Sequence, residues 1–76
     1  VIALNYRYFY LLDGSITVEN SLLLMGRRIR ETRNSQQISQ EALADMAGVD
    51  RSHMGFIELG KKDIRVSTLF KIARAL

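Results

Sequence analysis

Residues 39–60 read SQEALADMAGVDRSHMGFIELG, and this stretch decides the fold of the chain. Small and apolar residues recur at helical spacing in both of its halves. They are Leu43, Ala44 and Ala47 in the first half, and Met54 and Ile57 in the second. Gly48 lies between the halves, and glycine readily takes the left-handed conformation that ends a helix. The spacing therefore predicts two short helices joined by a tight turn.

The residues before each half are suited to begin a helix. Ser39 is a good N-cap, and Gln40 and Glu41 place polar and acidic groups in the first turn, where the helix dipole favours them. Asp50 is a second N-cap candidate, so the next helix is expected to begin at Arg51. The predicted helices thus run over 40–47 and 51–59.

Two further helices are predicted on either side, from about Ser21 or Leu22 to Asn34 and from about Val66 to Leu76. The fold class is therefore mainly α, a compact helical bundle. Helical periodicity also predicts the core, which is a packing role with no chemistry. Its expected members are Leu22, Met25, Ile29, Ile38, Leu43, Ala44, Ala47, Val49, Met54, Ile57, Val66, Leu69, Ile72, Ala73 and Leu76.

Three motifs resemble the lambda-repressor-like (XRE/Cro-type) helix-turn-helix family. They are Ser39-Gln40-Glu41-Ala42-Leu43-Ala44, Gly48 at the turn, and Ile57-Glu58-Leu59-Gly60. The similarity extends over about residues 22–76, from Met25-Gly26-Arg27-Arg28-Ile29-Arg30-Glu31-Thr32-Arg33 to Thr68-Leu69-Phe70-Lys71-Ile72-Ala73-Arg74-Ala75-Leu76. A motif of this length is specific, and it implies a sequence-specific DNA-binding transcription regulator with double-stranded DNA as its partner.

Within the family, two stretches are most similar to restriction-modification controller proteins. These stretches are Val49-Asp50-Arg51-Ser52-His53-Met54 and Asp63-Ile64-Arg65-Val66. A prophage-type repressor and the DNA-binding domain of an antitoxin or larger regulator stay open as alternatives, because the motif reports DNA binding rather than the genetic circuit. A rival of another class is a protein-interaction module that keeps the fold and presents its basic face to an acidic partner.

The third helix would enter the major groove with its N-terminal half. The outward residues expected to read bases are Arg51, Ser52, Gly55 and Phe56. Arg51 is the strongest candidate because its fork can pair with guanine O6 and N7, although contact with phosphate or solvent alone is the alternative. The expected contacts to the DNA backbone are Gln40, His53, Lys61, Lys62, Arg28 and Arg65. For His53, packing against the core edge is an equal alternative.

The resemblance also implies a structural salt bridge between Arg33 and Glu58, since a carboxylate on a DNA-facing helix would repel phosphate unless it were paired. The chain departs from the family at Gln37, where glycine is usual, and at Leu59, where a polar residue is usual. The connection before the second helix is therefore expected to be looser or differently shaped. Family members usually add a fifth helix that often carries the dimer contact, and this chain stops at Leu76.

Charge and composition agree with a nucleic-acid partner. Residues 22–76 hold ten Lys or Arg and six Asp or Glu, a net charge of +4, whereas residues 1–21 have a net charge of −1. The chain has no cysteine and one histidine, so nothing suggests a disulfide, a metal site, a cofactor or a catalytic group. No apolar run reaches membrane-span length, so a cytoplasmic protein, associated with the nucleoid through DNA, is expected. No enzymatic activity is expected, and no small-molecule effector is evident.

Residues 1–20 are predicted to form a separate N-terminal arm before a DNA-binding domain over 21–76. Ile2, Leu4, Tyr6, Tyr8, Tyr10 and Leu12 alternate with Ala3, Asn5, Arg7, Phe9 and Leu11, which suits a strand. Asp13-Gly14 is a hairpin turn before Ser15-Ile16-Thr17-Val18, so a β-strand or hairpin is expected. An isolated hairpin needs a surface to cover. A homodimer is expected in which residues 2–18 contribute to the contact. The alternative is that the functional protein begins at Met25.

Overall fold

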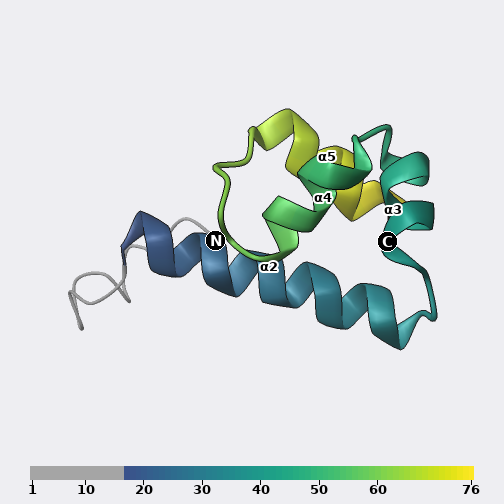
Figure 1. Cartoon of the computed structure of the whole chain (residues 1–76), viewed down its shortest axis with the longest axis horizontal. Helices are drawn as coiled ribbons and strands as arrows, with labels where there is room; N and C mark the ends of the chain where they lie inside the picture. The colour runs from purple at the N-terminus through teal and green to yellow at the C-terminus, as the bar shows by residue number, and fades with distance from the viewer. Residues whose placement is uncertain (1–16) are drawn as a thin grey trace.

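The computed structural model describes residues 17–76, and every regular element in this range is a helix. The helices are α2 (Val18–Ser35), α3 (Gln40–Ala47), α4 (Arg51–Glu58) and α5 (Val66–Ala75). The long helix α2 lies along one side of the bundle, and its first turns extend beyond α3, α4 and α5 (Figure 1). The mainly helical fold class predicted from the sequence is confirmed.

Helix α2 begins earlier than the sequence pattern indicated. Its first residue is Val18, and the side-chain oxygen of Thr17 caps it by accepting a hydrogen bond from Asn20 N at 3.0 Å. The helix therefore crosses the predicted boundary between arm and domain at residue 20. The expected strand is wrong for Val18, because capping by the Thr17 hydroxyl makes a helical start there. The rest of the predicted hairpin, residues 2–16, lies outside the described residues.

The turn between α3 and α4 follows the predicted chemistry closely. Ser39 Oγ accepts from Ala42 N at 3.0 Å, and Asp50 Oδ2 accepts from His53 N at 3.3 Å, so both predicted N-caps are confirmed. Gly48 ends α3 in the left-handed conformation, with φ of 67°. Ser39 therefore fixes the start of α3, while Gly48 and Asp50 fix where the turn begins and ends.

The connection between α2 and α3 is tight, so the looser connection expected from Gln37 in place of the family's usual glycine is wrong. Gln37 takes the left-handed conformation itself, with φ of 59°. Gln37 N donates to Asn34 O at 3.0 Å, and Ile38 N donates to Arg33 O at 3.1 Å. A left-handed conformation costs a residue with a Cβ roughly 1–2 kcal/mol, so the turn geometry is retained at a cost in stability.

The core lies where α2, α3, α4 and α5 meet. Its buried apolar residues are Ile29, Leu43, Ala44, Ala47, Met54, Ile57 and Ile72, all of them predicted. The prediction is wrong for Val66, which is 68% exposed in the first turn of α5, and for Ala73, which is also exposed. Ile64 and Ala75, which were not predicted, pack against the core instead.

Gly26 is a close-packing position that periodicity did not predict. It is buried on α2, and a Cβ placed there would lie 2.5 Å from Glu58 O and would also overlap Ile57 O. Only glycine lets the backbone of α2 approach the last turn of α4 this closely. This contact sets the position of α4 on α2.

No helix within residues 17–76 is long and apolar enough to cross a membrane.

Candidate nucleic-acid interface

Helix α4 has one buried face and one open face. Met54 and Ile57 are buried in the core, whereas Arg51 and Ser52 are exposed at the first turn. Met54 and Ile57, three apart, share the face that meets the core, whereas Arg51 and Ser52 stand in the first turn, at the exposed end of the helix. The side chains that can meet a ligand are thus gathered at the N-terminal half of the helix, as the sequence predicted.

The other two residues expected to read bases lie in different surroundings. Phe56 is 44% exposed, and the Lys62 ammonium lies 5.9 Å from the centre of its ring, within range of a cation–π contact. Gly55 is half-buried and faces the side chain of Gln40 on α3, whose Oε1 would lie 3.5 Å from a Cβ at this position. Gly55 is therefore part of the junction between α3 and α4.

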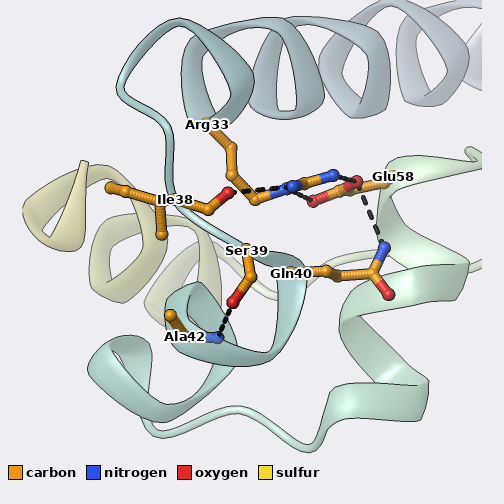
Figure 2. Close-up of polar contacts among 6 residues, drawn as sticks. All are labelled: Arg33, Ile38, Ser39, Gln40, Ala42 and Glu58. Atoms are coloured by element: carbon orange, nitrogen blue, oxygen red, sulfur yellow. Dashed lines mark hydrogen bonds and ion pairs between the residues drawn. The ribbon is translucent and has the colours of Figure 1, made fainter.

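A salt bridge joins the end of α4 to the end of α2 (Figure 2). Arg33 Nε donates to Glu58 Oε2 at 2.8 Å, and Arg33 Nη2 donates to Glu58 Oε1 at 3.0 Å. The side chains are only 11% and 3% exposed. The hydrogen bonds from Arg33 to Glu58 raise the pKa of the guanidinium, so Arg33 keeps its positive charge. The structure thus brings together the two residues that the resemblance implied.

Two further hydrogen bonds connect this pair to the turn before α3. Arg33 Nη1 donates to Ile38 O at 3.0 Å, and Gln40 Nε2 donates to Glu58 Oε1 at 3.2 Å (Figure 2). The buried carboxylate of Glu58, on α4, therefore accepts hydrogen bonds from α2 and from the first residue of α3. Such a bidentate, charge-assisted arrangement fixes orientation as well as distance. The angle at which α4 presents its open face depends on it.

A cleft of about 260 Å³ opens beside this network. Its lining comes from α2, α3, α4 and the residue after α4. The lining residues are Arg30, Arg33, Gln40, Gly55, Glu58 and Leu59. Arg30 is not among the DNA contacts predicted from the sequence. Its spacing of three from Arg33 could have placed it on the same face of α2.

The remaining basic residues expected at the DNA backbone are more scattered. The loop that follows α4 exposes Lys61, Lys62 and Arg65. His53 is half-buried in the first turn of α4. Arg28 is exposed on α2 but lines a different, largely apolar groove against α5, where Leu69 and Leu76 lie. The structure therefore gathers Gln40, the α4 residues and the loop lysines, and it does not bring Arg28 to them.

The described part of the chain offers no arrangement typical of a metal site. Across residues 17–76, no group of three or more His, Cys, Asp or Glu could hold a metal ion. The carboxylate that is most buried, Glu58, is occupied by Arg33 and Gln40. The chemistry available at this face is hydrogen bonding and charge, which suits the recognition of a polyanion.

Comparison with known proteins assigns the family. The family model described as helix-turn-helix matches residues 29–76, which is more than half of the chain. The chain therefore belongs to the helix-turn-helix family, in its lambda-repressor-like (XRE-type) branch, and is a DNA-binding transcription regulator. The resemblance stated from the sequence motifs is confirmed.

The relatives include restriction-modification controller proteins. The chain is 34% identical over 64 residues to Control protein C.SmaI of Serratia marcescens, covering 84% of this chain and 76% of that protein. This match is longer than the stretch from Met25 to Leu76, so it includes residues before Met25. The crystal structure of the restriction-modification controller protein C.AhdI from Aeromonas hydrophila superposes with a TM-score of 0.71 at 38% identity, covering 72% of this chain and 83% of that one.

A prophage-derived protein is also similar. The SPbeta prophage-derived uncharacterized HTH-type transcriptional regulator YonR of Bacillus subtilis (strain 168) is 34% identical over 53 residues, or 70% of this chain. The chain spans about half the length of YonR, because the match covers 49% of that protein. The controller proteins are therefore matched over more of their own length than this regulator is.

Proposed function

We propose that this protein regulates transcription as a homodimer that binds a pseudo-palindromic DNA site. Two copies of α4 would enter successive major grooves roughly 34 Å apart, one helical turn of DNA. The similarity to C.SmaI and C.AhdI supports a controller of a restriction-modification system as the biological role. Residues 2–18 are proposed to contribute to the dimer contact, because their aromatic and apolar composition favours a covered surface.

The observation that carries the proposal is the way in which α4 is held. Its inner face is buried through Met54 and Ile57, its last turn is fixed by Glu58, and its first turn leaves Arg51 and Ser52 exposed. A rigid helix with a free N-terminal half can place side chains against base edges without losing flexibility on binding. Arg51 is proposed as the guanine contact, with Ser52 and Phe56 beside it.

The backbone contacts proposed around α4 are Gln40, His53, Lys61, Lys62 and Arg65. Arg28 is proposed as a separate contact, on the side of α2 that lines the groove with α5. Such contacts position the protein without reading sequence. Lys61 and Lys62 are the best placed, because they follow α4 directly and are exposed. Lys62 additionally lies over the Phe56 ring, so it can hold that ring in place while its charge faces a phosphate.

Selection of bound sequences from a random DNA duplex library tests the proposal. We expect enrichment of an inverted repeat whose half-sites are about one helical turn apart. Arg51→Ala should weaken binding to the selected site by about 1–3 kcal/mol and relax the preference at one guanine. Binding of Arg51→Ala to random DNA should change much less. Equal losses on both DNAs would instead identify Arg51 as a phosphate contact.

A prophage-type repressor is the second candidate, and the similarity to YonR is the observation that favours it. The genes beside the coding sequence distinguish the two, since a controller is expected next to a methyltransferase and an endonuclease. A protein-interaction module would behave differently from either. Its binding to DNA would show no enriched sequence and a small ratio between specific and random affinity.

A further inference from the structure

Arg30 and Arg28 lie on opposite sides of α2. Successive residues of an α-helix are about 100° apart, so two residues separated by two positions are about 200° apart around the axis. Arg28 lines the groove against α5, whereas Arg30 lines the cleft shared with α3 and α4. Arg30 is thus directed to the same side of the molecule as Gln40 and Gly55.

The cleft carries one uncompensated positive charge. Arg33 and Glu58 neutralise each other through two short hydrogen bonds. Arg30 is exposed, and within residues 17–76 no hydrogen bond or ion pair holds its guanidinium. Leu59, which also lines the cleft, is apolar. The lining therefore combines a free cation with groups that carry no net charge, which favours an anion.

Gln40 adds hydrogen-bond donors to that wall. Its side-chain nitrogen donates one hydrogen to Glu58, and an amide nitrogen has a second hydrogen to donate. As the first residue of α3, Gln40 also carries a backbone N–H that has no partner inside the helix. The Glu58 contact holds the amide in place, so its second hydrogen is available at a fixed position.

Gly55 forms the part of the cleft where a side chain would take up space. A glycine inside a helix lowers stability relative to alanine, so it calls for a reason. Packing within the protein gives none here, since a Cβ at Gly55 would meet nothing closer than Gln40 Oε1 at 3.5 Å, an ordinary contact. The position differs in this respect from Gly26, where a Cβ would overlap the backbone. The space left at Gly55 is therefore not needed for packing within the protein and is available to a bound partner.

We infer that Arg30 is a further DNA contact of this protein. The cleft between α2, α3 and α4 seats one backbone phosphate, with the charge supplied by Arg30, donors supplied by Gln40, and space left by Gly55. The inference rests on the proposed function and deepens it. Gly55 lies one helical turn after Arg51, so a phosphate in the cleft lies on the same face of α4 as the proposed guanine contact.

The salt dependence of binding to a random-sequence DNA duplex tests the role of Arg30. Each phosphate contact adds about 0.9 to the slope of log affinity against log salt, which is about 3.5-fold in affinity between about 50 and 200 mM salt. We expect Arg30→Gln to lower the slope by about that amount for each bound protomer, hence by twice that for a dimer, and Arg30→Lys to retain the slope. The matched control is Lys71→Gln, which removes one charge from α5, a helix that does not line the cleft. Equal slopes for Arg30→Gln and Lys71→Gln would overturn the inference.

Gly55→Ala gives a second, independent readout. We expect a higher melting temperature than the wild type, because alanine favours the helix and no protein atom obstructs its Cβ, together with weaker binding to the same duplex. Higher stability with undiminished binding would overturn the role of the cleft. A wild-type protein that binds no duplex would instead overturn the proposed function, so the two failures are distinguishable.

Discussion

Removal of Arg33 is predicted to be among the most damaging single changes to this fold. Arg33→Met would leave the Glu58 carboxylate, 3% exposed, with only the 3.2 Å hydrogen bond from Gln40. A buried charge that loses its partner costs about 3–5 kcal/mol. Ile38 O would also lose its donor, but Ile38 is half-buried, so water can replace Arg33 there at a small cost.

The reciprocal change is expected to be milder. Glu58→Gln keeps an oxygen that can accept from Arg33, and the Arg33 side chain, 11% exposed, lies nearer to solvent than that of Glu58. The double variant Arg33→Met/Glu58→Leu should recover part of the loss, because a packed apolar pair leaves no unpaired charge. Recovery should be incomplete, since Gln40 loses its acceptor in that variant.

Urea unfolding followed by circular dichroism measures these free energies. For a domain of this size each kcal/mol shifts the melting temperature by about 4–8 °C, so Arg33→Met should melt at least about 12 °C below the wild type. Arg27→Met removes an exposed arginine from the same helix and should change stability by no more than about 0.5 kcal/mol. Strict additivity of Arg33→Met and Glu58→Leu in the double-mutant cycle would refute the clamp.

Three other outcomes follow from the backbone and the termini. Gln37→Gly should raise the free energy of unfolding by about 0.5–1 kcal/mol in thermal melts, because glycine takes a left-handed φ without strain. The control Gln36→Gly, at a φ of −93°, should lower it, and equal effects of the two changes would argue against strain at residue 37. Gly26→Ala should unfold the domain or lower its melting point sharply, since the Cβ would overlap the α4 backbone; a wild-type melt would show that α2 and α4 can separate freely. Deletion of residues 1–16, which spares the Thr17 cap, should weaken the dimer in light scattering, and a truncated protein that dimerises with full affinity would place the contact on the helices.

The family and the helix order could be predicted from the sequence because they depend on local features. Ser39, Gly48 and Asp50 act through bonds or dihedral angles within four residues, so their roles can be seen in the chain itself. The pairing of Arg33 with Glu58, 25 residues apart, was inferred only through resemblance to a family. Neither the residues around Arg33 nor those around Glu58 indicate that the end of α2 contacts the end of α4.

Only the tertiary structure decided which side of a helix meets which neighbour. Val66 and Ala73 follow the apolar period of α5 yet remain exposed, because the helix turns Ile72 toward the core. Gly26 is required by the backbone of α4, which approaches it from another part of the chain. Arg28 and Arg30 carry the same charge, and they differ only because α2 lines a groove with α5 on one side and a cleft with α3 and α4 on the other. Periodicity fixes the angle between residues on one helix, but the direction in which that helix faces depends on contacts made across the fold.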